Sequence, residues 1–232
     1  MRVKRSFVIK VSIIFILIMI GIYAIDYFRE NVDIFDTPEE HFPNLHNAER
    51  FFFRVGYPEE WDSEAGSYNF FLEDSTGLVL NLFPLVESPD ATAIPVTDEN
   101  ATPLPEPLVR DETAILSFYY REIKEDEEID LSTAMEMAIS ELLESEKNIK
   151  EEDLSSITEV ETDNVLLKKV SYTYIPNVFP VKGDMYVAVR KMCYYIIVFE
   201  AEHDVLAGSS YNKYKDTVDE IISDFRFSVF DY

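Results

Sequence analysis

Apolar residues are unevenly distributed along this chain, and the longest run of them, Phe7–Ile25, comes almost at its start. The run holds 19 residues and is interrupted only by Lys10 and Ser12. At about 1.5 Å per residue, a helix of this length extends about 28 Å, which is close to the hydrocarbon thickness of a bilayer. Lys10 lies one turn from the basic end, where its ammonium can reach the membrane surface. The pattern therefore predicts one transmembrane helix.

Charges at the two ends of this run predict its orientation. Arg2, Lys4 and Arg5 precede it, and Asp26 follows it. Positive charge stays on the cytoplasmic side of a membrane, so residues 1–25 are expected to form a signal anchor with a cytoplasmic basic tip. The rest of the chain is then extracytoplasmic and held at the cell membrane.

A cleaved signal peptide is the alternative to an anchor. Ala24 suits the last position before a cut, but Ile22 then fills a position that prefers a small residue. A bacterial lipoprotein is excluded because no cysteine directly follows the run. A buried amino-terminal helix of a soluble protein is disfavoured because the run has no polar face.

Residues 26–50 are polar with scattered aromatic side chains, and prolines at positions 38 and 43 interrupt them. This composition predicts a stalk with at most one short helical turn. The folded domain is expected over residues 51–232, which is enough chain for one domain with a sizeable core.

Alternation of apolar and polar residues predicts the strands of this domain. Leu116, Phe118 and Tyr120 alternate with more polar neighbours, which gives a strand with one buried face after Ala114. Cys193–Ala201 is apolar on both faces, which predicts a central strand covered on each side. The other predicted strands are Phe51–Tyr57, Tyr68–Leu72, Leu78–Phe83, Ile157–Glu161, Lys169–Tyr174 and Met185–Val189, with a short strand or tail over Phe225–Phe230.

A period near 3.6 predicts two helices, Ser132–Lys147 and Tyr211–Ser223. The first can be capped by Asp130 or Ser132, and the second by Ser209 or Ser210. In the first helix the apolar stripe is Met135, Ala138, Ile139 and Leu142.

Between the strands, Glu87–Thr113 differs in character because it carries five prolines among polar and acidic spacers. Such a segment cannot bury enough apolar surface to offset the entropy lost on ordering. We expect a flexible, proline-rich acidic insertion at residues 87–113. A proline-rich docking peptide is the functional alternative.

The charge of the chain is strongly negative, with 45 acidic and 20 basic residues and a formal net charge of −25. All of the acidic residues follow Ile25. Such a domain repels nucleic acid and anionic lipid head groups, whereas it tolerates cation-rich partners. The simpler interpretation is that the acidic surface keeps an exported domain soluble.

Residues that could support catalysis are few. Cys193 is the one cysteine and lies in an apolar strand, so a buried thiol is expected. His41 and His46 do not share a helix face, and His203 precedes Ser209 without a glycine-flanked nucleophile turn. No phosphate-binding glycine loop and no Cys/His ligand cluster is present in the sequence. We therefore expect no catalytic residues, metal or cofactor; the alternative is a hydrolase of the cell envelope that uses paired carboxylates.

The order of motifs resembles that of the bacterial PsbP-like domains. The shared features are Val55-Gly56-Tyr57-Pro58-Glu59-Glu60-Trp61, the aromatic strand Tyr194–Ala201 and a final helix closing on Ser223-Asp224-Phe225. These domains are related to the extrinsic PsbP subunit of photosystem II and share a fold with the nuclear-import factor that binds the GTPase Ran. The resemblance covers Phe51–Phe227, whereas the anchor and the insertion depart from it.

This resemblance implies an α/β/α sandwich (an α+β fold) with a mostly antiparallel central sheet, here preceded by one transmembrane helix. It implies no enzyme, because such domains are mostly accessory or binding proteins. A purely structural component of an envelope complex is the third possibility.

Binding to an envelope protein is therefore the predicted function, with no nucleic acid involved. Tyrosine offers a large contact area with few rotatable bonds, which suits a protein interface. Tyr119 and Tyr186 are the candidate partner-binding residues, and Tyr194 is a further candidate on the neighbouring strand. The alternative is that these rings lie under the helices as core, which is favoured more for Tyr194 than for Tyr119.

Overall fold

A computed structural model describes residues 42–66, 77–88, 108–123, 128–162, 165–176, 178–203 and 209–228. Neither helix in these ranges has the length and apolarity that crossing a bilayer requires. The predicted anchor Phe7–Ile25, the predicted strand Tyr68–Leu72, His41 and most of the predicted insertion lie outside the described residues.

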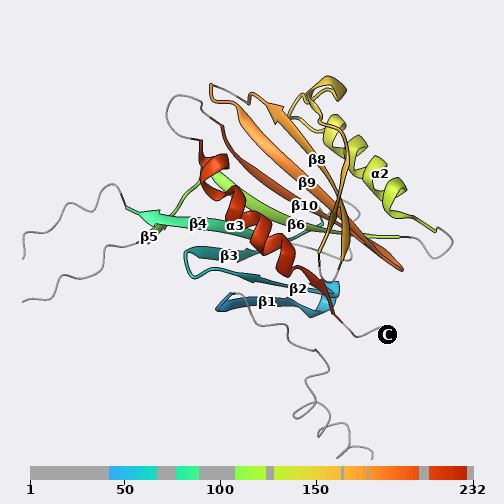
Figure 1. The fold of residues 1–232 in the computed structure, drawn as a ribbon, viewed down its shortest axis with the longest axis horizontal. Coiled ribbons are helices and arrows are strands. Elements are labelled where there is room, and N and C mark those ends of the chain that lie inside the picture. The colour runs from blue at the N-terminus through green and yellow to red at the C-terminus, as the bar shows by residue number, and fades with distance from the viewer. Residues whose placement is uncertain are drawn as a thin grey trace, which may run out of the picture. The chain divides into compact units, whose positions relative to one another are not determined.

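An eight-stranded antiparallel sheet forms the body of the domain (Figure 1). Its strand order is β3-β4-β6-β10-β9-β8-β7, with β5 paired to β4, and every pairing is antiparallel. The strands are β3 (Trp61–Ala65), β4 (Leu78–Glu87), β5 (Leu108–Arg110), β6 (Ala114–Glu122), β7 (Thr158–Glu161), β8 (Leu166–Tyr174), β9 (Val181–Arg190) and β10 (Cys193–Glu202).

The strand β10 lies at the centre of this sheet, as its apolar sequence predicts. Its odd-numbered residues, such as Tyr195 and Ile197, belong to one core, and its even-numbered residues, such as Tyr194 and Ile196, belong to a second core. Because successive side chains of a strand point to opposite faces, the sheet is buried on both sides here. The predicted central strand is confirmed, and Cys193 is buried.

Each side of the sheet is covered by one helix. Helix α2 (Leu131–Glu144) packs mainly on β9 and β8, and α3 (Ser210–Asp224) packs on β10, β2 and β6 (Figure 1). Asp130 accepts a hydrogen bond from the Thr133 amide at 2.7 Å and caps α2, while Ser209 caps α3. The α/β/α arrangement and both predicted helices are confirmed.

A second, three-stranded sheet packs on the α3 side of the domain. It has the order β1-β2-β11, from β1 (Asn44–Ala48), β2 (Phe53–Tyr57) and β11 (Arg226–Phe227). The ring of Phe53 is fully buried, 5.8 Å from the ring of Phe118 on the large sheet and 5.5 Å from that of Phe225 after α3. This sheet therefore belongs to the larger core.

The structure corrects several predicted boundaries. The predicted stalk 26–50 includes β1 and the start of a short 3-10 helix (Glu49–Phe51), so the fold begins before Phe51. Phe52 adopts a left-handed backbone with φ of 57°, which delays the predicted strand to Phe53. Trp61 starts the strand β3 (Trp61–Ala65), which was not predicted. Both ends of the predicted insertion belong to strands, because Glu87 ends β4 and Leu108–Arg110 forms β5, which pairs with the end of β4.

Candidate partner-binding face

Of the three tyrosines predicted to contact a partner, two have buried rings and one has a half-buried ring. Tyr186 is 1% exposed and Tyr194 is 3% exposed, so the expectation of exposed rings is wrong for these two. The Tyr186 hydroxyl donates to Asp219 of α3 at 3.1 Å, and burial raises the pKa of Tyr186. Tyr119 is half-buried on the other side of the sheet and packs at the edge of the core beneath α2. Of the candidates, only Tyr119 is accessible to a partner.

Tyr119 belongs to a part of the sheet that we call the open sheet face. On the α2 side of the sheet, the main contacts of α2 are with β8 and β9, which leaves β4 and much of β6 without a helix within the described ranges. Antiparallel pairing places residues that lie opposite each other on the same face. The open sheet face consists of Asn81, Phe83, Ile115, Ser117, Tyr119 and Val198.

Polar groups in the middle of this face are paired with one another. The Ser117 hydroxyl is buried and donates to the Asn81 side-chain oxygen at 2.7 Å. Burial raises the pKa of Tyr119, and a hydrogen bond with Ser117 offsets part of that effect. Phe83, Ile115 and Val198 are half-buried beside these groups. The centre of the face is therefore apolar and aromatic, and the Ser117 hydroxyl and the Asn81 side-chain oxygen in it are paired with each other.

Ion pairs border the open sheet face on three sides. Arg110 pairs with Asp62 at 2.7 Å and with Glu64, and its guanidinium lies 4.6 Å from the centre of the Phe83 ring. At another border, Arg121 Nη2 lies 2.8 Å from Glu141 Oε2.

The third border is the pair formed by Lys147 and Glu200, whose Nζ and Oε1 atoms are 2.5 Å apart. An apolar centre with a charged rim is the usual anatomy of a protein–protein interface.

The carboxylate of Glu200 is also held by tyrosines. The Tyr172 hydroxyl donates to it at 2.7 Å across Gly183, which lies between them in the row of paired residues on β8, β9 and β10. A Cβ at position 183 would lie 2.2 Å from the Tyr172 ring, so only glycine leaves room for this contact. Glu200 therefore accepts from the Tyr172 hydroxyl while it pairs with Lys147.

Another carboxylate, that of Asp184, lies on the opposite side of the sheet and is fully buried. It accepts hydrogen bonds from Ser171 at 2.5 Å and Tyr211 at 2.7 Å and pairs with Lys169 Nζ at 2.7 Å. Burial raises the pKa of Asp184, but these three partners outweigh burial and hold the pKa below its usual value. The group is ionised and satisfied, so it is a poor proton donor.

The histidines do not form a catalytic arrangement in the described ranges. His203 Nδ1 lies 2.8 Å from Ser209 Oγ, but that hydroxyl caps α3, where it accepts from the Asn212 amide. Asp204 is outside the described residues. His46 lies on β1, and burial lowers its pKa. No group of three or more potential metal ligands is found among the residues that the structure describes.

The loop between β8 and β9 exposes apolar side chains, and this exposure was not predicted from the sequence. Ile175, Val178 and Phe179 are 68%, 77% and 50% exposed. The signal was present, because residues 170–181 contain no charged side chain and include Pro176 and Pro180. Such a composition also fits a buried strand, so burial could not be predicted from it.

No model of a known protein family matches this sequence, and no curated protein sequence matches it. A search of solved structures finds the solution structure of cyanobacterial PsbP (CyanoP) from Synechocystis sp. PCC 6803, with 13% identity and a TM-score of 0.46 over 79% of this chain and 91% of that one. It also finds a crystal structure from Bacteroides thetaiotaomicron VPI-5482, with 12% identity and a TM-score of 0.39 over 76% of this chain. This chain spans only 45% of that protein. Similarity of this size does not assign the chain to a family, and membership of the PsbP-like domains stays a prediction.

Proposed function

We propose that this domain acts by binding a protein partner through the open sheet face, with Tyr119 as its central contact. The observation that carries the proposal is a partly buried centre of Tyr119, Phe83 and Ile115 inside a border of ion pairs. Strands rich in aromatic residues are normally covered on such a face. No helix among the described residues covers β4 and much of β6 on the α2 side, and a partner would provide a cover.

Tethering at the cell membrane is the second part of the proposal. The run Phe7–Ile25 would hold the domain outside the cytoplasm, where an envelope protein is the available partner. Full-length protein should then stay in membranes through a carbonate wash, and protease added from outside should cleave the domain. Release of a mature form that begins after Ala24 would contradict the tether.

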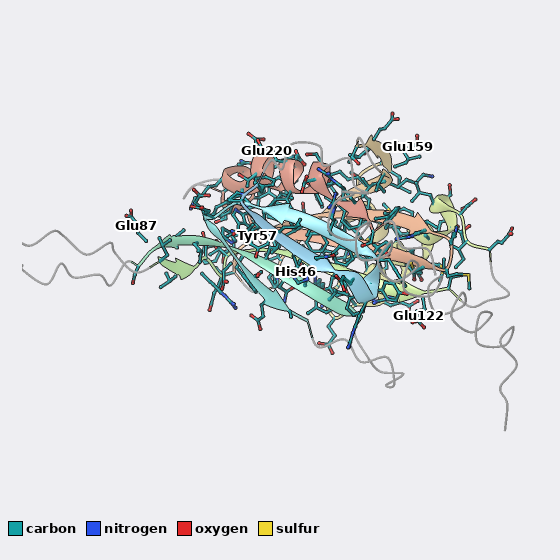
Figure 2. The ribbon with its side chains drawn as sticks, turned by 90° about the horizontal axis from the view of Figure 1, so that it is seen from below. His46, Tyr57, Glu87, Glu122, Glu159 and Glu220 are labelled. Carbon is teal, nitrogen blue, oxygen red and sulfur yellow. The ribbon has the colours of Figure 1, made fainter. Side chains whose placement is uncertain are left out.

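The binding proposal is tested with a photo-crosslinking amino acid at position 119 in cells. The control places the same group at Glu220, which points away from the sheet on α3 (Figure 2). We expect one envelope protein to be crosslinked from position 119 and not from position 220.

Affinity measured with that purified protein then tests the contact directly. Tyr119→Ala should weaken binding by about ten- to a hundred-fold, or ~1.4–2.7 kcal/mol, because a central aromatic contact is lost. Glu220→Ala should bind as the unaltered chain does, and both variants should be folded by thermal unfolding. Equal affinity for Tyr119→Ala would refute the proposal, and turnover abolished by Asp184→Asn or Glu200→Gln would favour the hydrolase instead.

A further inference from the structure

The loop between β8 and β9 carries exposed apolar side chains, and hydrogen bonds hold its base in place. Tyr174 and Val181 pair directly at the ends of the two strands, and the His203 amide donates to the Pro180 carbonyl at 2.8 Å. On one side of the base, Lys182 Nζ lies 4.3 Å from the centre of the Tyr211 ring. The fold therefore holds the side chains of Ile175, Val178 and Phe179 in solvent.

Charged side chains are absent from the sequence of this loop and lie at its base. No charged residue occurs between Lys169 and Lys182, although 28% of the chain is charged. At the base, Tyr174 is half-buried, and Lys147 Nζ lies 5.4 Å from the centre of its ring while pairing with Glu200. In a bilayer surface, the apolar tip would reach the hydrocarbon, and the tyrosine and lysine side chains at the base would lie at the depth of the phosphates.

The composition of the tip favours lipid over a protein pocket. Protein hot spots are enriched in Trp, Tyr and Arg, whereas valine is under-represented in them. Three side chains also provide far less than the roughly 800 Å² that each partner contributes to a stable protein interface. A bilayer needs no matching shape, and the tether proposed above, on which this step rests, would make a small contact sufficient.

We infer that this loop inserts Ile175, Val178 and Phe179 into the surface of a zwitterionic lipid bilayer. The net charge of −25 opposes anionic lipid, so the contact depends on apolar insertion and not on attraction between opposite charges. The inserted residues are separate from the open sheet face, although the Lys147–Glu200 pair lies both at its border and at the base of the loop. The contact would fix which end of the domain faces the membrane.

The test uses the full chain in phosphatidylcholine vesicles, with Val178→Cys labelled by an environment-sensitive fluorophore. Met137→Cys on α2, also an exposed apolar position, is the matched control. The unaltered chain controls for Cys193, which is buried and should not label. We expect blue-shifted emission at position 178, several-fold stronger quenching by lipid-attached doxyl groups than at position 137, and several-fold weaker quenching by aqueous iodide.

Charged substitutions at the tip should abolish the effect. Adding Ile175→Asp and Phe179→Asp to the labelled chain should return position 178 to the emission and iodide quenching of position 137, without changing thermal unfolding. Iodide quenching at position 178 equal to that at position 137 in the unaltered loop would overturn the inference. Protection of position 178 in native membranes but not in phosphatidylcholine vesicles would overturn it in favour of a protein pocket.

Discussion

Charged side chains inside this domain have partners at hydrogen-bonding distance. Asp184 has no exposed surface and contacts Lys169, Ser171 and Tyr211. By contrast, Lys150 and Glu152 form an ion pair in which both side chains are largely exposed. The Lys169–Asp184 pair is shielded from water and the Lys150–Glu152 pair is not. Substitutions in the two pairs therefore compare the contribution of a buried charge to stability with that of a surface charge.

Asp184→Asn should lower the free energy of unfolding by about 3–5 kcal/mol, because the Lys169 ammonium is left without its counter-charge. Urea unfolding of the two proteins measures the difference. Glu152→Gln is the control and should leave the urea midpoint unchanged. A loss no larger than that of the control would mean that Asp184 is not an ionised partner of Lys169.

The pH dependence of stability gives a second readout of the same substitution. The folded-state pKa of Asp184 lies below its usual value of 3.8, so the unfolded state binds the proton more tightly. Its stabilisation is therefore fully present above about pH 4 and is lost as the pH falls through the lowered folded value. Asp184→Asn should lack this part of the acid-induced loss, so the two stability curves should converge at low pH.

Helix ends are set by side chains that accept from the first free amides of each helix. Both serines at the start of α3 could cap it by sequence, and the structure assigns the role to Ser209. Ser210 instead lies 2.7 Å from the Thr113 hydroxyl and so connects the helix to the start of β6.

Ser209→Ala should destabilise the domain by about 1 kcal/mol because the Asn212 amide loses its acceptor. Ser209→Asp should retain most of the stability, since aspartate also caps and its charge favours the helix amino end. Ser223→Ala, in the last turn of α3, serves as the control and should change stability by only a few tenths of a kcal/mol. Thermal unfolding of the three variants measures this order, and an unstable Ser209→Asp would contradict the capping role.

At the scale of the whole molecule, two sheets share one core. Phe53 on β2 connects them, because its ring lies 5.6 Å from Tyr195 as well as near Phe118 and Phe225. Asp224 at the end of α3 accepts from the Gly56 amide at 2.8 Å, which ties the helix to the small sheet. Because β1 pairs with β2, this small sheet also includes a strand that precedes the predicted domain start at Phe51.

Phe53→Ala should lower the free energy of unfolding by about 3–5 kcal/mol, since it opens a cavity between the two sheets. Leu45→Ala on the neighbouring strand β1 is the control, because that side chain is about half exposed and should cost much less. Denaturant unfolding of both variants compares them. Equal, small losses would indicate that the small sheet is not packed on the larger one.

The sequence by itself determined the elements whose pattern is complete within a short stretch. The central strand β10, the strand β6 and the helices α2 and α3 were predicted because their period of apolar residues is a local property. The antiparallel sandwich was implied by the resemblance to the PsbP-like domains, and it is confirmed. The small strand β1 and the start of β3 at Trp61 have no such period, and they exist only because a neighbouring strand pairs with them.

Tertiary structure alone decided which side chains are available for function. Tyr119 and Tyr186 both sit on aromatic strands, but Tyr186 lies beneath α3, whereas Tyr119 lies at the edge of the area that α2 covers. The apolar residues of the β8–β9 loop resemble those of a core strand in type, yet they extend past the end of the sheet. Burial depends on which segments pack over a residue, and those segments are distant in the sequence, so no local pattern encodes it.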